Sequence, residues 1–305
     1  MSAPIPGTGQ VSTTAPDTGS HAPAEPVAPG PAGRRNRLLR LGPSILLPAG
    51  ILAVLVAAAA IPGVLAPSGP LAMEPAVAFT PPGPGHWFGT DESGRDVFSR
   101  VIHGARSSLL IGVLATVIGL GVATVLGALA GLGTRTLDFG VSRFLEVLFA
   151  FPGLLLALLV ITILGPGVVT TTVAVGLSTA PGYARMIRSQ VLSVRHSGYV
   201  EASLVQGRSR WFIIRQHILP NVAAPLLVLA TLGIGQAIVW ASSLSFLGLG
   251  ATPPDPEWGS MLSNGRLYIG NAWWLTVFPG LCIVLSAATT TLIGHGVQRH
   301  LKENR

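Results

Sequence analysis

The sequence predicts an all-α polytopic membrane protein with six transmembrane helices, and three observations predict it. Hydrophobic residues make up 49% of the 305 residues and charged residues only 10%, whereas a soluble domain carries about 25% charged residues. Six apolar runs approach the roughly 20 residues that a helix needs to cross a bilayer. The basic residues concentrate in alternate connections between those runs. A chain of this composition cannot cover a water-facing surface, which excludes a soluble enzyme.

The predicted membrane runs occupy residues 43–65, 107–132, 144–164, 168–183, 222–247 and 273–296. The third run contains Pro152, where we expect a kink, and the fourth is diluted by Pro181 and three threonines. Such residues are tolerated in membrane helices, because neighbouring helices satisfy the backbone groups that they free.

Charge orients the chain with both termini in the cytoplasm. In that orientation 15 of the 19 basic residues lie on the cytoplasmic side, as the positive-inside rule requires. The predicted segments begin with a disordered cytoplasmic tail at 1–38, a first transmembrane helix at 39–67 and an extracytoplasmic segment at 68–106. A core of five transmembrane helices follows at 107–297, and it contains a cytoplasmic connection at 185–221. The chain is predicted to end in a cytoplasmic tail at 298–305.

The tail is predicted to be disordered because residues 1–33 contain no Lys or Arg and are dominated by Pro, Ala, Gly, Ser and Thr. It does not resemble a signal peptide, since nothing basic precedes an early apolar core. The first apolar run is therefore expected to be an uncleaved membrane helix.

The second membrane run has a small residue at every fourth position, namely Ala115, Gly119, Ala123, Gly127 and Gly131. Such a ridge lets another helix approach closely. We expect a packing role for it.

The segment before that run, residues 89–100, has two open interpretations. Asp91 or Ser93 can cap a short helix whose apolar face, with Phe98 and Val101, lies on the bilayer or on a neighbouring subunit. A solvated, capped loop fits the pattern equally well. Farther along the chain, Trp258, Trp273 and Trp274 are expected to form an outer aromatic belt.

The cytoplasmic connection at 185–221 is far longer than an ordinary loop, which favours a functional role. Residues 199–206 predict a two-turn helix that ends at Gly207, with the small residues Ala202 and Ser203 on it. A short helix with a small-residue face fits a groove on a soluble partner. A simple surface connector is the alternative.

At these residues the chain resembles a known family. Glu201-Ala202-Ser203, followed by Gly207 and closed by Leu219-Pro220, resembles the EAA loop of ABC importer membrane subunits. More narrowly, the chain is similar to the second permease of the dipeptide, oligopeptide and nickel importers. The segments that carry this narrower resemblance are 89–109, 244–250, 253–259 and 278–280.

The resemblance implies a type I importer permease fold in the cell membrane. It implies a homologous second permease, two ATP-binding subunits and an extracytoplasmic solute-binding protein as partners. The positive-inside pattern accounts for the basic residues, so no nucleic-acid partner is predicted. The ATPase-coupling residues that the resemblance implies are Tyr199, Glu201, Ala202, Ser203, Gly207, Leu219 and Pro220. It implies no cofactor in this chain, with ATP bound by the partner subunits.

One lysine supports that division of labour. A Walker phosphate-binding loop needs Gly-Lys followed by Ser or Thr. Lys302 is the only lysine in the sequence and Glu303 follows it. We therefore predict a transport subunit without its own ATPase site.

The chain departs from the family pattern at several positions. Ser203 stands where the family usually has Ala, Glu146 where it commonly has Asp, and Ala241 where many members have an acidic residue. Thr291 and His295 likewise replace a usual Asn and Asp.

Polar residues in the membrane runs lead to modest expectations. Glu146 is predicted to pair with Arg143, three residues earlier. Gln236 is predicted either to line the pathway or to bond a neighbouring helix. The histidines His103, His196, His217 and His295 show no metal-ligand spacing and are expected to be structural or interfacial.

The function predicted from sequence is ATP-driven import of dipeptides or oligopeptides, with this chain forming half of the pathway. The alternatives are the same role for nickel or another small solute, a self-sufficient secondary transporter, and a membrane scaffold without transport activity.

Overall fold

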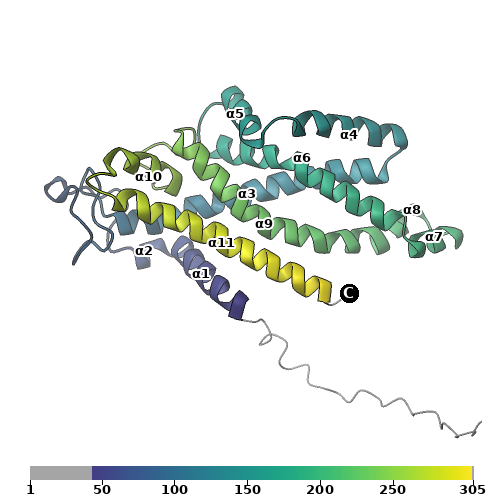
Figure 1. The fold of residues 1–305 in the computed structure, drawn as a ribbon, viewed down its shortest axis with the longest axis horizontal. Coiled ribbons are helices and arrows are strands. Elements are labelled where there is room, and N and C mark those ends of the chain that lie inside the picture. The colour runs from purple at the N-terminus through teal and green to yellow at the C-terminus, as the bar shows by residue number, and fades with distance from the viewer. Residues whose placement is uncertain (1–42, 304–305) are drawn as a thin grey trace, which may run out of the picture. The chain divides into compact units, whose positions relative to one another are not determined.

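The computed structural model describes residues 43–303, and every regular element among them is a helix (Figure 1). The predicted all-α class is therefore confirmed for this part of the chain. The tail predicted at 1–38, the first residues of the helix predicted at 39–67, and the last two residues lie outside it.

The first predicted membrane run forms two helices, α1 (Pro43–Ala60) and α2 (Pro62–Leu65). They are divided at Ile61, whose φ of −129° and ψ of 52° are not helical. The proline that follows disfavours the helical conformation of the residue before it, which explains the break. α1 packs along α3 and α11.

The segment between α2 and α3 contains one short helix, η2 (Pro75–Val77), and leads into α3 (Val97–Leu132), a helix of 36 residues. Asp96 caps α3, because its carboxylate accepts the backbone N–H of Ser99 at 2.8 Å. The short amphipathic helix expected near Phe98 is thus wrong, since these residues are the first turns of α3. Val97 and Val101 are buried, in a cluster with Met261 and Trp274 rather than on a free outer face.

The third predicted run, 144–164, is not one straight helix. α4 (Arg135–Phe149) and α5 (Gly153–Leu164) meet at an angle of 92°. Pro152 lies at the junction and removes a backbone donor while restricting Phe151, so the expected kink becomes a full break.

α6 (Val168–Arg195) continues well past the predicted end at 183, so the start of the connection at 185–221 is helical. The ridge of small residues on α3 faces α6, as expected. A Cβ on Gly119 would lie 2.6 Å from the carbonyl oxygen of Gly176, and one on Gly127 would lie 2.8 Å from that of Ala184. The two backbones are close enough that only glycine fits at these positions.

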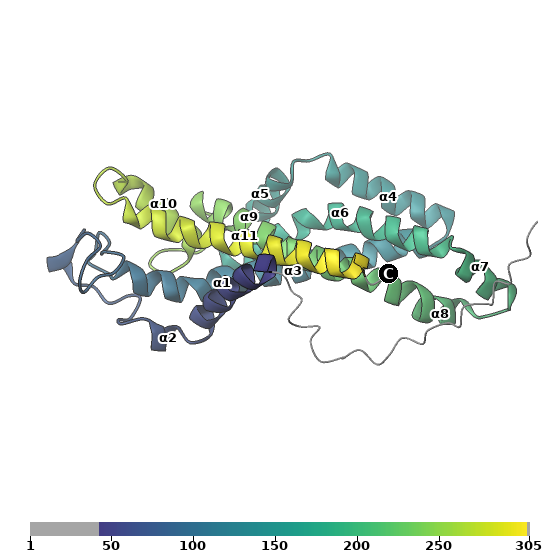
Figure 2. The same ribbon diagram turned by 60° about the horizontal axis from the view of Figure 1, so that its bottom comes forward.

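The remaining described residues form seven helical elements: α7 (Gly198–Val205), α8 (Arg210–Ile213), the π-helical turn η3 (Ile214–Ile218), α9 (Leu219–Phe246), α10 (Trp258–Gly265), η4 (Arg266–Tyr268) and, last, α11 (Trp274–Glu303). α9 packs against α3, α6 and α11. In both views α7 and α8 lie at the opposite end of the helices from α10 (Figure 1, Figure 2).

Two segments that carry the family resemblance meet at the α10 end. The Ser108 hydroxyl on α3 donates to the buried Glu257 carboxylate at 3.2 Å, and Glu257 caps α10. The guanidinium of Arg100 donates to the carbonyl of Pro254 at 3.2 Å. These contacts join the segments 89–109 and 253–259, which lie far apart in sequence.

The aromatic belt expected at this end is wrong for two of its three residues. Trp258 and Trp274 are buried, and their Nε1–H groups donate to the carbonyls of Val101 and Thr90, each at 3.0 Å. A buried indole needs such a partner. Trp273 is half exposed, so a position in a belt stays a prediction for it alone.

Within residues 43–303, three helices are long and apolar enough to cross a membrane: Val97–Leu132, Arg210–Phe246 and Trp274–Leu301. The bent pair α4–α5 makes a fourth if it counts as one broken span. The membrane-spanning character of the chain is supported, while the prediction of six spans is not settled by length and composition.

Candidate docking surface

α7 is held to the rest of the protein by one buried face. Val200 is 1% exposed and packs in an apolar cluster with Ile213, Ile218 and Val222. Gly207 ends the helical region with φ of +73°, a left-handed conformation that favours glycine. The amide of Gly207 donates to the carbonyl of Leu204, and that of Arg208 to the carbonyl of Ser203. The helix predicted at 199–206 and its glycine stop are therefore present.

At the same end of the protein, α7, α8 and their flanking residues expose large apolar side chains. We call this surface the tip patch, and its residues are Tyr199, Leu204, Val205, Trp211 and Phe212. Val205 is 89% exposed and Trp211 is 69% exposed. Contiguous apolar side chains that contact water mark interaction surfaces, because burying them against a partner is favourable.

Arginines surround the tip patch. Arg208, Arg210 and Arg215 are exposed, and the guanidinium of Arg208 lies 5.0 Å from the centre of the Phe212 ring. Glu201 on α7 is exposed as well. Protein–protein interfaces usually have an apolar centre with a polar rim, and arginine is enriched in them.

The residues expected in the coupling loop lie in three places, apart from Gly207 after α7. Tyr199 and Ser203 come together with His217, whereas Glu201 and Ala202 lie on the exposed side of α7. Leu219 and Pro220 are exposed in the first turn of α9.

His217, which the sequence predicts to be structural or interfacial, links α7 to η3 and so has a structural role. Its Nε2 lies 3.1 Å from the Ser203 Oγ, and its ring centre lies 5.6 Å from that of Tyr199. The serine that departs from the family pattern was the sequence signal for this contact, because it adds a hydroxyl to a small-residue face.

Ion pairs support the helices at the same end. Arg188 on α6 donates to both carboxylate oxygens of Asp138 on α4, at 2.6 and 2.7 Å. Arg143 pairs with Glu146 at 3.1 Å, as predicted, and both side chains are exposed.

Gln236 lies in the second half of α9, beside an open hollow of about 310 Å³. The Tyr183 hydroxyl on α6 donates to its side-chain oxygen at 3.4 Å. The hollow is lined by Leu232, Gly235, Gln236, Val239, Trp240, Ala287 and Thr291. Gln236 therefore contacts a neighbouring helix and also faces open space.

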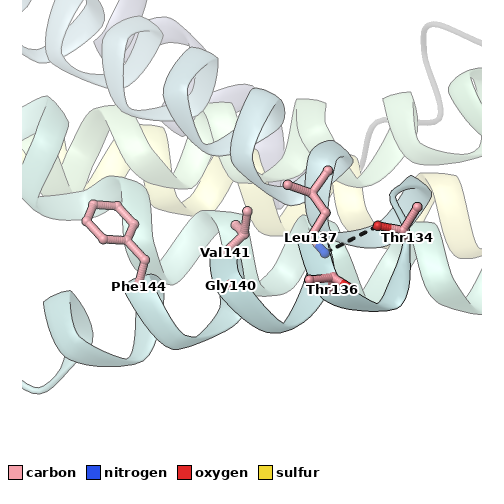
Figure 3. A pocket seen from close by; sticks show the side chains of 6 residues that line it. All are labelled: Thr134, Thr136, Leu137, Gly140, Val141 and Phe144. Atoms are coloured by element: carbon pink, nitrogen blue, oxygen red, sulfur yellow. Dashed lines mark hydrogen bonds between the residues drawn. The ribbon is translucent and has the colours of Figure 1, made fainter.

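A larger hollow of about 500 Å³ lies along α4 (Figure 3). Its lining comes from Thr134, Thr136, Leu137, Gly140, Val141 and Phe144, and the Thr134 hydroxyl accepts the Leu137 N–H at 3.4 Å. None of these side chains is charged, and all lie in one stretch of chain, so the hollow is an open helix face rather than an enclosed site. In the described part of the chain, no three His, Cys, Asp or Glu residues gather as metal ligands.

Comparisons with known proteins identify the chain's relatives. The family described as the binding-protein-dependent transport system inner membrane component matches residues 123–304. The dipeptide transport system permease protein DppC of Alkalihalophilus pseudofirmus is 44% identical over 213 residues, covering 70% of each chain. The probable D,D-dipeptide transport system permease protein DdpC of Escherichia coli is 40% identical over 234 residues, covering 77% of this chain and 78% of the relative.

A third relative has a different cargo in its name. The glutathione transport system permease protein GsiD of Pectobacterium atrosepticum is 41% identical over 217 residues, covering 71% of this chain and 72% of its own. Among solved structures, a chain of the MetNI methionine ABC transporter in an inward-facing conformation aligns with a TM-score of 0.54 and 19% identity. That alignment covers 66% of this chain and 95% of the other, and it shows a shared fold.

Proposed function

The chain belongs to the binding-protein-dependent transport system inner membrane components, and we propose that it forms half of the translocation pathway of an ATP-driven importer of short peptides. As a transport subunit of such a system it works with a second permease, ATP-binding subunits and a binding protein. We propose two ATP-binding subunits on the cytoplasmic side, which hydrolyse the ATP in place of this chain.

The tip patch is the observation that carries the proposal. It combines strongly exposed apolar side chains with an arginine rim at one end of the helices. The positive-inside pattern places that end in the cytoplasm, where ATP is available. Such a patch is unfavourable in water unless a partner covers it. A groove on an ATP-binding subunit supplies that cover.

The topology that fits this placement has six membrane segments: α1–α2, α3, α4–α5, α6, α9 and α11. Both termini are then cytoplasmic, and α10 with residues 66–96 lies outside, toward the binding protein. The coupling residues are those of the connection at 185–221, with Tyr199, Glu201, Ala202, Ser203 and Gly207 around α7, and with Leu219 and Pro220 at the start of α9.

A continuous helix connects the tip patch to the membrane centre. The stretch Arg210–Phe246 passes from α8 through η3 into α9 without a break. Gln236 lies about 15 Å from the outer end of α9, which is half the thickness of a bilayer core of about 30 Å. A movement of α7 imposed by ATP binding in a partner therefore reaches mid-membrane through one element. The coupling requires that the patch make different contacts in the two states of the transporter.

Peptide cargo is supported by the relatives and by the residues at that depth. Dipeptide, D,D-dipeptide and glutathione permeases share peptide amides as the common chemistry of the cargoes that they are named for. The Gln236 amide and the Thr291 hydroxyl line one hollow, and an exposed amide at this depth is costly against lipid. Both groups can hydrogen-bond a peptide backbone without reading its side chains.

The test is uptake into proteoliposomes that contain this chain with its second permease and ATP-binding subunits, driven by the binding protein. We expect uptake of labelled dialanine to require ATP and the binding protein. Uptake of nickel but not dialanine would redirect the proposal to a metal cargo. Uptake by this chain alone without ATP would instead support a secondary transporter.

A further inference from the structure

The contact between Ser203 on α7 and His217 in η3 has a defined direction. The Ser203 hydroxyl has one proton, and it donates to the carbonyl of Tyr199 at 2.8 Å. Its oxygen is then an acceptor toward the His217 Nε2 at 3.1 Å, so this nitrogen carries a proton and donates. The bond is partly buried, where water competes less for the donor and the acceptor.

The histidine ring is held in place from several sides. Tyr199 and Phe212 lie against it, with ring centres 5.6 and 5.9 Å away. The Asn221 side chain donates to the backbone carbonyl of His217 at 2.6 Å. The π-helical turn η3 widens the helix at this point, and such turns are frequent at functional sites.

We propose that Ser203 and His217 form a latch that positions α7 on η3, so that a displacement of α7 moves the helix leading to α9 directly. This inference rests on the proposed function, because it assigns the latch to coupling. Val200 anchors α7 by non-directional apolar contact. The hydrogen bond adds an orientation that apolar packing lacks, and it uses a hydroxyl in place of the alanine that the family resemblance leads one to expect.

The test separates the latch from transport by two measurements on four single variants and on the double variant Ser203→Ala/His217→Leu. Ser203→Ala and His217→Leu remove the bond, and His217→Gln keeps a donor near the Nε2 position while removing the ring. Ser197→Ala is the matched control, because the Ser197 hydroxyl donates only within its own turn, to the carbonyl of Val194.

The first measurement is amide hydrogen exchange of the α7 segment in the full chain in nanodiscs. Ser203→Ala and His217→Leu each remove the hydrogen bond between the two side chains. We therefore expect local opening of α7, and with it amide exchange, to become about three- to tenfold faster in each variant. The double variant should be no faster than either single variant, because both remove the same bond. His217→Gln and Ser197→Ala should exchange like the wild type. Faster exchange in His217→Gln than in His217→Leu would show that ring packing holds α7, and would overturn the latch.

The second measurement is dialanine imported per ATP hydrolysed in the reconstituted importer. We expect this ratio to fall about three- to tenfold in Ser203→Ala and His217→Leu, and to be restored in His217→Gln. An unchanged ratio in variants whose α7 opens faster would overturn the positioning role. A wild-type importer without ATP-driven uptake would sink the proposed function instead, while hydrogen exchange would still report on the latch.

Discussion

Arg188 on α6 and Asp138 on α4 form a two-point ion pair, in which Nε and one terminal nitrogen of the guanidinium each reach one carboxylate oxygen, at 2.6 and 2.7 Å. This pair fixes the side of α4 that faces α6, close to the start of α4 and to the end of α6, the helix that α7 follows in the chain.

Asp138→Asn should lower the stability of the protein modestly. The two-point geometry is stronger than a single contact, but both side chains are about 30% exposed, so we expect a loss of about 1 kcal/mol. Thermal unfolding in detergent measures the change. Glu146→Gln is the control, because its pair with Arg143 is open to solvent and should matter little. Equal effects of the two substitutions would contradict the structural role of the Arg188–Asp138 pair.

Gly119→Ala should disrupt the packing of α3 on α6. The added Cβ would lie 2.6 Å from the backbone oxygen of Gly176, and backbone cannot move aside cheaply, so we expect a destabilisation of about 1–3 kcal/mol. Gly121→Ala on the same helix meets nothing within 4 Å and should be neutral or slightly stabilising. The comparison is made by thermal unfolding of the two variants, and matching stabilities would refute the close approach of the two helices.

Gly207→Ala should reduce transport through the backbone alone. A Cβ at Gly207 has open space, but φ is +73°, which costs a non-glycine residue about 1–2 kcal/mol. Gly198→Ala, at the other end of α7, also has open space and has no positive φ. ATP-driven dialanine uptake should fall severalfold in Gly207→Ala and remain near wild type in Gly198→Ala. If both variants transport equally, the left-handed turn after α7 is not needed for coupling.

Gln236→Leu should impair import while leaving the protein folded. The substitution keeps a similar volume but removes the amide that faces the hollow and accepts from Tyr183. We expect dialanine uptake to fall several-fold while binding of the ATP-binding subunits is unchanged. Tyr183→Phe separates the two roles of Gln236, because it removes the helix contact and spares the amide. Uptake that falls equally in both variants would mean that the contact, not the pathway, is what matters.

Local patterns in the sequence predicted part of this architecture well. The ridge from Ala115 to Gly131 faces a partner helix, and Gly207 ends the α7 region, because both depend on spacing and backbone freedom within a few residues. At Pro152 the sequence predicts a kink, whereas the structure has two separate helices, α4 and α5. A continuous apolar run does not indicate whether a proline bends a helix or divides it.

Contacts between residues far apart in the chain could not be predicted from local sequence patterns. Trp258 has an apolar ring and a polar N–H, which fit a membrane interface and a buried site equally well. Trp258 is buried because α3 packs against it and brings the Val101 carbonyl within hydrogen-bond distance of the indole N–H. In the same way, the widened turn η3 sets which side of the chain His217 presents to α7, and sequence spacing does not reveal that turn.

The central claim is that the tip patch couples this chain to ATP hydrolysis in a partner. The most direct measurement is ATP-driven dialanine uptake by the reconstituted importer carrying Val205→Asp, read together with the recovery of the ATP-binding subunits, with Leu267→Asp as control. The side chains of Val205 and Leu267 are both strongly exposed, but Leu267 lies on η4, which follows α10 at the opposite end of the helices. We predict that Val205→Asp lowers both the recovery of the ATP-binding subunits and uptake at least tenfold, while Leu267→Asp leaves recovery unchanged. Normal subunit recovery and normal ATP-driven uptake in Val205→Asp would contradict the account.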